Sequence, residues 1–333
     1  MTWFERLTGF NEASPRQVRE NLRVEGEVLT SLVNGRTYVH GRLETPSLLE
    51  LRNRVTALGP AAGKLSLREV VADVKELHVD PAHAGSLFQV ASQFNLLEMT
   101  SPRVTPEQGV GIYENDPTQG PACAIAAGAG TIYRNYFARV KGHIGQSARH
   151  QIDCLADIGM ALDNPSHHFW KMNNGYVLAS RGGLGKISSR LATSSEHELD
   201  RLRRFLRIGI QWNTQVTLED CQHRVTQAYC SALPIAYSHL PAEPWENFAC
   251  LVLDASYEAT ICAAILNARS TGNRRVFLTL LGGGAFGNDP DWIMGAIERA
   301  LRLHERHDLE VAIVSHGASK RAVQQFIQQF ASP

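Results

Sequence analysis

A glycine-rich segment in the C-terminal third of the sequence is the strongest candidate for chemistry. The apolar run 276–281 leads directly into Gly282, Gly283, Gly284, Ala285, Phe286, Gly287 and Asn288, and Asp289-Pro290 then opens a helical pattern. Glycines let a backbone approach a ligand closely, their N–H groups can bind phosphate oxygens, and the next helix adds a positive dipole end. A tight connecting turn is the simpler alternative. Three consecutive glycines exceed what a connection needs, so the segment predicts a phosphate-binding loop.

Polar side chains end an apolar run earlier in the chain. Residues 87–91 have the composition of a buried strand, and Ser92, Gln93, Phe94 and Asn95 follow it. Amide groups can bind ribose hydroxyls without adding charge. The same residues could instead cap their own backbone in a turn, and the sequence leaves both interpretations open.

A second loop precedes a run of small residues. Residues 115–117 are a turn signal, and a segment rich in Ala and Gly begins at Pro121. Proline is favoured in the first turn of a helix, and small residues let another backbone come close. Thr118, Gln119 and Gly120 would then lie at a helix N-terminus and form a second anion site. Tight packing for structural reasons alone is the alternative.

Strand-length apolar runs alternate with helical patterns along the chain, which is typical of an α/β sheet with helices on its faces. Strands are expected at 86–91, 176–180, 225–230, 248–253, 276–281 and 310–314, with a further β-prone stretch at 70–79. Helices are expected at 15–21, 48–58, 260–268 and 291–304, the last with Asp289 as N-cap and Pro290 at its first position.

The chain is expected to divide into an N-terminal extension, residues 1–65, and an α/β domain, residues 66–333. Within the extension, Asn34-Gly35 between two β-prone runs predicts a hairpin. A less regular stretch at about 141–218 is interpreted as an insertion. It contains a capping-box pattern that starts at Ser195 and opens a basic helix.

Composition and charge exclude several classes of protein. The 333 residues include 33 basic and 33 acidic side chains, so no global field attracts a polyanion, and no strong nucleic-acid-binding patch is expected. The six cysteines lie far apart without metal-ligand spacing, and no signal peptide is recognised at the N-terminus. No run approaches the ~20 apolar residues of a membrane-spanning helix. These features predict a protein of a reducing, cytoplasmic setting, with no membrane partner and an undetermined oligomeric state.

Taken together, these segments resemble a macrodomain, the ADP-ribose-binding α/β/α module. Residues 91–95 look like the family's strand that closes with an Asn-rich turn, and residues 120–130 are similar to the loop and small-residue helix that follow it. Residues 225–237 look like a mid-sheet strand, and residues 279–287 resemble the second phosphate loop. The resemblance covers about residues 77–317 and implies a three-layer α/β/α mixed sheet, elaborated by the N-terminal extension and the insertion.

The resemblance also implies a ligand and the residues that contact it. ADP-ribose or a related nucleotide diphosphate would lie against Gln93, Thr118, Gln119, Gly120 and the loop from Gly282 to Asn288. Asp80, an acidic residue after an early strand, would hold the adenine. Asn95 would orient the distal ribose, with Phe286 packed against it. The family's usual three glycines are absent from the first loop, where residues 118–120 stand instead. No cofactor and no metal are expected.

Macrodomains include both hydrolases of ADP-ribosyl linkages and readers without turnover, and the fold does not decide between them. In a hydrolase, Asp116 or Glu98 would polarise the attacking water, although either could be a turn residue or a surface charge. The insertion favours the enzyme over a non-catalytic ADP-ribose reader, because a reader needs only the minimal module. An unrelated nucleotide-binding α/β protein is a third possibility, without the G-x-x-x-x-G-K-[ST] loop of an NTPase.

Two further side chains have two interpretations each, and one further pair is considered. Cys123, near a helix N-terminus, could be a nucleophile, but its small apolar neighbours favour a buried structural thiol. Glu258, expected at the start of a helix, could line the pocket or serve as a first-turn charge. Ser315 and His316 are adjacent, and adjacent residues seldom form a catalytic pair.

Overall fold

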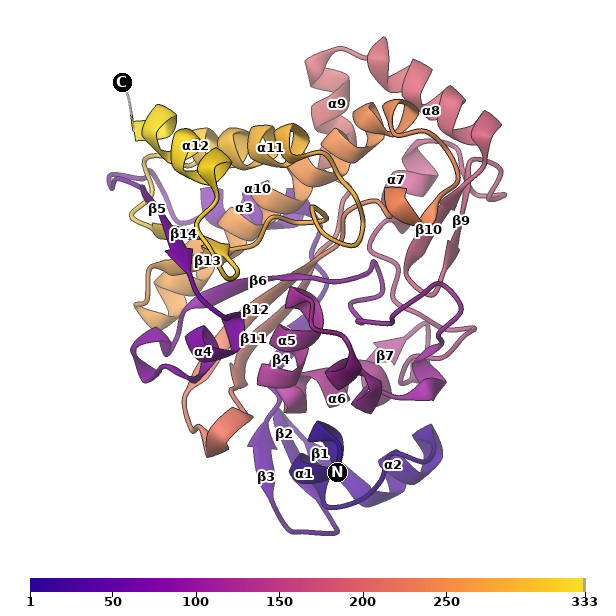
Figure 1. Ribbon diagram of the computed structural model, residues 1–333, viewed down its shortest axis with the longest axis vertical. Coiled ribbons are helices and arrows are strands. Elements are labelled where there is room, and N and C mark those ends of the chain that lie inside the picture. The colour runs from indigo at the N-terminus through magenta and orange to yellow at the C-terminus, as the bar shows by residue number, and fades with distance from the viewer. Residues whose placement is uncertain (332–333) are drawn as a thin grey trace.

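The computed structural model describes residues 1–331, and its centre is a seven-stranded mixed sheet (Figure 1). In sheet order, the strands are β4 (Arg42–Glu44), β11 (Gly209–Gln215), β12 (Arg224–Cys230), β6 (Leu87–Ala91), β13 (Arg275–Leu278), β14 (Glu310–Ser315) and β5 (Ser66–Val71). The last five of these run parallel to one another, whereas β11 is antiparallel to both of its neighbours. The carboxyl ends of five parallel strands therefore meet at one edge, where ligands bind in open α/β sheets.

Helices cover both faces of this sheet, as the sequence predicted. On one face lie α4 (Val74–Val79), α5 (Gln119–Ala126) and α6 (Gly128–Tyr136). On the other lies α10 (Glu246–Thr271), which is covered in turn by α3 (Leu48–Thr56), α8 (Arg181–Ala192), α9 (Glu196–Arg203) and α11 (Pro290–Leu303) (Figure 1). Helix α12 (Arg321–Ala331) packs against the edge strand β5. The expected three-layer α/β/α architecture is confirmed.

The remaining elements lie at the periphery. The N-terminal part contains α1 (Trp3–Thr8), α2 (Pro15–Asn21) and a three-stranded sheet of β1 (Leu22–Glu25), β2 (Val28–Ser31) and β3 (Thr37–Val39). The insertion contains the hairpins β7 (Arg139–Val140) with β8 (His143–Ile144) and β9 (Trp170–Asn173) with β10 (Tyr176–Ala179), and helix α7 (Ala156–Ala161). Short 3-10 helices are η1 (Pro81–His83), η2 (Pro106–Gln108), η3 (Gly111–Asn115), η4 (Leu218–Asp220), η5 (Ile235–Tyr237) and η6 (Glu243–Trp245).

Helix α10 is the buried centre of the fold. The sheet covers one side of α10 and four helices cover the others, so apolar residues occur all around this helix and not only along one stripe. Within residues 1–331, the segment Glu243–Thr271 is the one helix long and apolar enough to span a membrane, with a mean hydropathy of 1.6. Of that apolar window, 83% is buried inside the protein, so the fold itself covers it. The sequence predicted a strand at 248–253 and a helix at 260–268 where this single helix lies.

Several predicted element boundaries were wrong. Residues 248–253 belong to α10 and are not a strand. The β-prone stretch 70–79 is the end of β5 followed by α4, which Asp73 caps. Residues 176–179 form β10, which pairs with β9 outside the main sheet. Conversely, β11 lies within the supposed insertion 141–218 but belongs to the main sheet.

The N-terminal extension also differs from its predicted limits. The hairpin of β2 and β3 is present, but it closes through a five-residue connection in which only Gly35 has a positive φ, of 73°. Strand β4 forms the edge of the main sheet, and α3 packs on α10. Residues 42–56, predicted to lie in the extension, therefore pack with the main sheet and α10.

Candidate active site

A cavity of about 730 Å³ lies at the carboxyl ends of the parallel strands. Its walls come from the ends of five strands and the segments that follow them, namely residues 72–75 after β5, 91–93 and 98–100 at and after the end of β6, Ala232 after β12, 279–286 after β13, and Val314 and His316 at the end of β14. The volume is within the ~300–1,000 Å³ typical of small-molecule sites. This position is the ligand crevice expected for the fold class.

The cavity forms where two neighbouring strands separate. Strands β6 and β13 pair only at Leu87 with Val276 and at Phe88 with Phe277. Beyond this point the side chain of Gln119 replaces the missing strand, because its Oε1 accepts from the N–H of Ala91 at 2.9 Å and its Nε2 donates to the carbonyl of Gln89 at 2.8 Å. The amide of Gln119 thus anchors the start of α5 to β6. It lines the cavity as predicted, but its polar atoms are bound to the protein.

The glycine-rich loop after β13 presents free donors at the cavity wall. It is held by internal bonds, such as those from the N–H of Gly283 to Leu280 and from the N–H of Asn288 to Gly282. Four residues that line the cavity have N–H groups without an acceptor among residues 1–331, namely Gly282, Gly284, Ala285 and Phe286. Such a cluster of backbone donors binds anions, phosphate groups above all.

The N-terminus of α5 supplies a second set of donors on the facing wall. Thr118, its N-cap, makes no side-chain capping bond, and its own N–H donates to Asp116 Oδ1 at 2.9 Å. The N–H groups of Gln119 and Gly120 have no acceptor within the described chain. All four residues line the cavity, and the dipole of α5 adds a positive potential at the same place.

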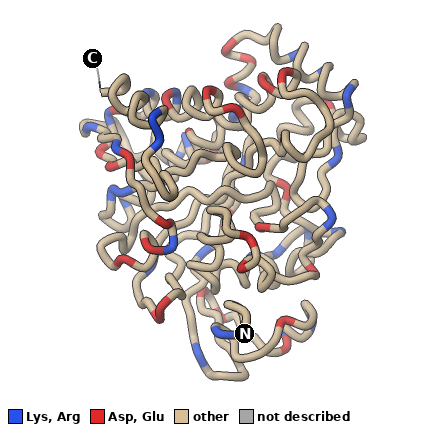
Figure 2. The backbone as a smooth tube through the Cα atoms, viewed as in Figure 1, with Lys and Arg blue, Asp and Glu red and all other residues tan. Residues whose placement is uncertain are grey.

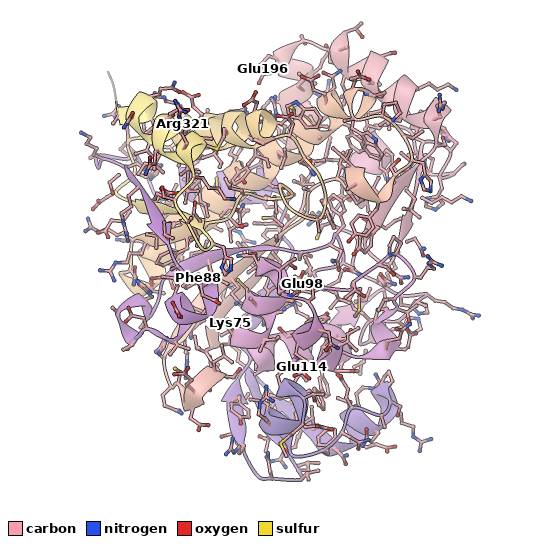
Figure 3. The ribbon with its side chains drawn as sticks, viewed as in Figure 1. Lys75, Phe88, Glu98, Glu114, Glu196 and Arg321 are labelled. Carbon is pink, nitrogen blue, oxygen red and sulfur yellow. The ribbon has the colours of Figure 1, made fainter. Side chains whose placement is uncertain are left out.

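Glu98 is the most unusual ionisable group in the cavity (Figure 3). Its side chain is 3% exposed, and its Oε1 has no hydrogen-bond partner among the described residues. Burial raises the pKa of Glu98 well above its ordinary value, and repulsion from Asp116 adds to the shift while Arg134 opposes it. The carboxyl is therefore protonated under conditions where an exposed glutamate is ionised, which suits a general acid.

The surroundings hold Glu98 in place from two sides. Its N–H donates to the hydroxyl of Tyr113 at 3.0 Å. Below it, the buried guanidinium of Arg134 lies 3.7 Å from the centre of the Tyr229 ring and donates to the carbonyl of Leu96 at 3.2 Å. A cation without a direct carboxylate partner thus lies near a buried acid without a hydrogen bond, a combination that marks functional sites more often than structural ones.

Three aromatic rings form the wall on the Glu98 side. Phe286 from the glycine-rich loop lies 5.5 Å from Tyr176 and 5.6 Å from Tyr237, measured between ring centres, and all three line the cavity. The hydroxyl of Tyr176 donates to the carbonyl of Met99 at 2.5 Å. Because Tyr176 lies on β10, the insertion contributes directly to the cavity.

The cavity therefore brings most of the predicted site residues together. Those that line it are Gln93, Glu98, Asp116, Thr118, Gln119, Gly120, Gly282, Gly283, Gly284, Ala285 and Phe286. The polar side chain of Gln93 is partly engaged, because its Oε1 accepts from the N–H of Met99 at 2.8 Å.

Two predicted residues, Asn95 and Asp80, lie elsewhere. Asn95 is fully buried, where its Oδ1 accepts from the N–H of Leu97 and its Nδ2 donates to Gln151 at 2.9 Å. The alternative interpretation, a turn that caps its own backbone, is the correct one. Asp80 begins η1, ahead of β6 and thus at the opposite end of that strand, and its Oδ1 accepts from the N–H of Ala82.

The end of the glycine-rich loop is also structural. Asn288 donates through Nδ2 to the carbonyl of Leu233 at 2.8 Å, and Gly287, with a φ of 70°, packs against Ala236. Neither residue lines the cavity. The ligand-facing part of the loop consequently ends at Phe286.

The sequence reading missed other residues of the cavity wall. Asp73 and Lys75 follow β5, His316 follows β14, and Lys320 precedes α12. Asp73 was hidden because the strand before it was predicted to continue to residue 79. It has the position, directly after an early strand, for which Asp80 was proposed. Tyr176 was missed because it lies in the insertion.

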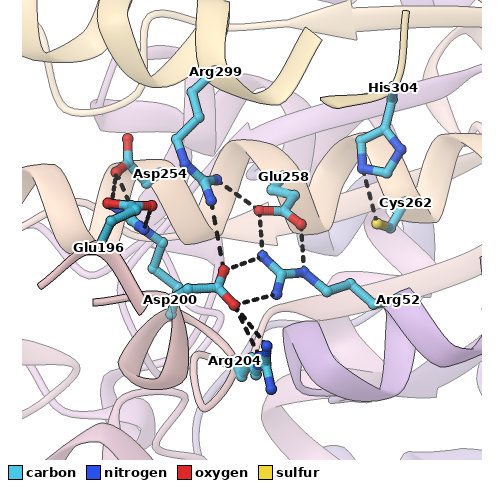
Figure 4. Close-up of polar contacts among 10 residues, drawn as sticks. Arg52, Glu196, Asp200, Arg204, Asp254, Glu258, Cys262, Arg299 and His304 are labelled. Atoms are coloured by element: carbon cyan, nitrogen blue, oxygen red, sulfur yellow. Dashed lines mark hydrogen bonds and ion pairs between the residues drawn. The ribbon is translucent and has the colours of Figure 1, made fainter. Parts of the chain in front are cut away.

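Glu258 belongs to a different cluster, shown in Figure 4, and neither interpretation of it was right. It lies in the middle of α10, 2% exposed, and accepts from Arg52 at 2.8 Å and Arg299 at 2.7 Å. Arg52 also donates to Asp200 on α9. The ion pairs of this cluster connect α3, α9 and α11 to α10 (Figure 4). They line a second pocket, separate from the cavity.

Cys123 has the environment of a structural thiol. It is fully buried, accepts from Gln119 Nε2 at 3.2 Å, and burial raises the pKa of its thiol well above the ordinary value. No group of three or more His, Cys, Asp or Glu side chains among residues 1–331 has the arrangement of a metal site. Charges of both signs are interspersed along the chain (Figure 2).

Comparison with solved structures finds proteins of similar architecture. The poly(ADP-ribose) glycohydrolase of Thermomonospora curvata matches with a TM-score of 0.44 and 12% identity, over 95% of this chain and 95% of that one. The enzyme of Deinococcus radiodurans matches in its apo form with a TM-score of 0.43, 12% identity and coverages of 88% and 94%. Its complex with ADP-ribose gives a TM-score of 0.42, 12% identity and coverages of 87% and 92%. No family model and no curated protein matches the sequence.

Proposed function

We propose that the cavity binds ADP-ribose, or a closely related nucleotide diphosphate, and that the protein hydrolyses an ADP-ribosyl linkage. The observation that carries the proposal is the buried, unpartnered carboxyl of Glu98 in a cavity that also holds two sets of free backbone N–H groups. The backbone N–H groups can bind the oxygens of a diphosphate, and Glu98 can act as the general acid that cleaves the glycosidic bond of the neighbouring ribose.

The order of the strands divides the cavity into three regions. Glu98, Asp116 and the aromatic rings lie by β6 and β12, the glycine-rich loop follows the central strand β13, and Asp73, Lys75 and His316 follow β5 and β14. At about 4.8 Å between strands, β6 and β5 are roughly 14 Å apart. An elongated ligand with a diphosphate in its middle fits this order, with the adenosine near Asp73 and the distal ribose near Glu98.

Glu98 would supply the proton chemistry. Cleavage at the distal ribose C1″ needs a proton on the leaving group and a water molecule to attack the developing oxocarbenium ion. A carboxyl held protonated by burial can donate that proton, and the carboxylate left behind can then accept one from water. Asp116, the other carboxylate at the β6 end of the cavity, would orient the water. Phe286 would pack against the ribose.

Calorimetric titration of the protein with ADP-ribose is the direct test, with AMP and NAD as comparators. We expect a dissociation constant on the order of 1 µM, or about −8 kcal/mol, for ADP-ribose and weaker binding of AMP. Gly284→Glu should remove binding, because Gly284 lines the cavity in open space and a carboxylate there would repel the diphosphate. Gly295→Glu is the matched control, since Gly295 has no atoms within 4 Å of its missing Cβ on helix α11.

A turnover assay then separates an enzyme from a reader. Release of ADP-ribose from an ADP-ribosylated protein or nucleic acid, lost in Glu98→Gln, would support the hydrolase. Tight binding without release from any such substrate would leave a non-catalytic reader. Absence of heat with all three nucleotides would refute the proposed ligand.

A further inference from the structure

The N-terminal extension is joined to the segment that carries half of the candidate site. Trp3, Phe4, Leu7 and Val18 form a second apolar core, separate from that of the main sheet. The same core includes Tyr113 of η3 and residues of α5 and α6, among them Ala124, Ile132 and Tyr136. The extension therefore packs directly behind the wall of the cavity.

Glu12 makes the closest polar contact of this interface. Its carboxylate accepts from the N–H of Val110 at 2.9 Å, from the N–H of Gly111 at 2.6 Å and from the hydroxyl of Tyr136 at 2.6 Å. A Cβ atom on Gly109 would lie 2.5 Å, and one on Gly111 2.9 Å, from Glu12 Oε2. The backbone at 109–111 is thus shaped around this one carboxylate.

Trp3 strengthens the same attachment. Its indole Nε1 donates to the carbonyl of Val110 at 3.0 Å, and its backbone N–H donates to Glu114 Oε2 at 2.9 Å. Figure 3 shows Glu114 beside the N-terminal helix α1, with Glu98 farther from that helix in this view. Both ends of η3 are therefore held by the extension.

The segment held in this way, η3, contacts the candidate acid Glu98 directly. Tyr113, in the middle of η3, is fully buried, and its hydroxyl accepts the N–H of Glu98. Asp116 follows η3 directly, and Thr118 and Gln119 follow within three residues. A shift of η3 would move Glu98, Asp116 and the N-terminus of α5 together.

We propose that Glu12 is a positioning residue for the site, acting through η3 and the Tyr113 hydroxyl on Glu98. The effect on catalysis rests on the proposed function. The coupling of Glu12 to the position of Glu98, through η3 and Tyr113, does not depend on that function. The extension is thereby part of the working site and not an independent appendage. Misplacement of a catalytic group by about 1 Å can reduce a rate roughly a hundredfold.

The test compares Glu12→Gln with the matched control Glu20→Gln. Both remove one negative charge from the extension, but Glu20 is exposed and pairs only with Arg16. Amide hydrogen exchange, measured without ligand, should become faster in Glu12→Gln at the bonded amides of Glu98, Asp116 and Thr118, and stay unchanged in Glu20→Gln. Glu12→Asp, which keeps the charge, should restore part of the protection. Unchanged exchange at Glu98 in a folded Glu12→Gln protein would overturn the coupling.

Kinetics provide the second measurement. In an active protein, Glu12→Gln should lower kcat about ten- to hundredfold and raise KM by a clearly smaller factor, since the donors of α5 would shift with η3 while those after β13 are untouched. Tyr113→Phe removes the link to Glu98 alone, so its effect and that of Glu12→Gln should not be additive. Full additivity, or an equal loss in KM, would contradict a positioning role. A wild-type protein without turnover would refute the proposed function, while the exchange data would still decide the coupling.

Discussion

Gly120 lies directly against the carboxylate of Glu98. A Cβ atom at residue 120 would overlap Glu98 Oε2 and the carbonyl oxygen of Ala91. The absence of a side chain is therefore what lets the N-terminus of α5 approach both the end of β6 and the buried acid. Without this approach the first-turn donors of α5 would be too far from Glu98 to act on the same ligand.

Replacement of Gly120 by alanine should damage both stability and binding. The added Cβ meets a backbone carbonyl, which cannot rotate away, so we expect a loss of about 1–3 kcal/mol in the free energy of unfolding. Gly185→Ala is the control, because Gly185 lies within α8 with open space around it, and alanine there should stabilise by up to about 1 kcal/mol. Denaturant unfolding and titration with ADP-ribose measure the two effects. Equal stability of both variants would contradict the tight approach.

Glu98→Gln should separate activity from stability. We expect turnover to fall by a factor of at least about 100 while ADP-ribose still binds, because the amide keeps the shape but not the proton. The pKa of Glu98 is raised in the folded state, so its neutral form favours folding below its ordinary value of 4.5, and this benefit is lost as the pH rises through the folded-state pKa. Glutamine never ionises, so the variant should gain stability relative to the wild type as the pH rises. A Tm difference that is independent of pH would refute the shifted pKa.

Asn95→Ala should act on the fold and not on the ligand. The substitution leaves the N–H of Leu97 and the side chain of Gln151 without their partner in a buried turn, at a cost of about 1–3 kcal/mol. Titration under conditions where the variant is fully folded should return nearly the wild-type affinity for ADP-ribose. A large loss of affinity in the folded variant would show that Asn95 contacts the ligand, and would contradict its assignment to the turn.

The cluster around Glu258 should contribute stability with the opposite dependence on pH. Burial raises the pKa of Glu258, but Arg52 and Arg299 outweigh it and lower the pKa overall. Hydrogen bonds from Arg52 lower the pKa of Asp200 to about 2. The stability from these groups is present above about pH 4 and is lost as the pH falls towards 2.

Glu258→Gln tests this cluster. Removing one member of a buried ion pair typically costs about 3–5 kcal/mol, so the variant should unfold at clearly lower denaturant concentration. Its stability should also fall less steeply than that of the wild type between about pH 4 and 2. Binding of ADP-ribose should persist, because Glu258 does not line the cavity. A loss of less than about 1 kcal/mol would place the cluster among ordinary surface ion pairs.

Local signals in the sequence predicted several elements closely. Helix α2 has the predicted bounds, α11 begins with the predicted cap at Asp289, and the capping box at Ser195 is formed. These features depend on side chains within one turn, so their chemistry can be read without the rest of the fold. The two loops for which phosphate binding is proposed could be located for the same reason, since each is a short run of glycines or a helix start after a strand.

Features that depend on distant packing were not predictable in this way. Residues 248–253 look like a strand because α10 is apolar on every side and shows no helical period. Strand β11 contains Gln211 and Thr214, which are buried through contacts with other elements, so its sequence does not resemble a buried strand. Asp73 was not identified because the β-prone stretch was expected to continue to residue 79, past the end of β5. The sequence could not separate Glu98 from Asp116 as the candidate catalytic carboxylate, because the burial of Glu98 depends on contacts with η3 and α5.

The attachment of α1 to η3 has a consequence for biosynthesis. Trp3 and Val110 are 107 positions apart in the chain, so α1 leaves the ribosome long before its partner is made. At about 5–20 residues per second, the interval is roughly 5–20 s. During that time only the extension's own residues, such as Val18 and Leu29, are present to cover Trp3 and Phe4, which are buried in the finished protein. The order of synthesis therefore separates the appearance of the N-terminal helix from its docking on η3.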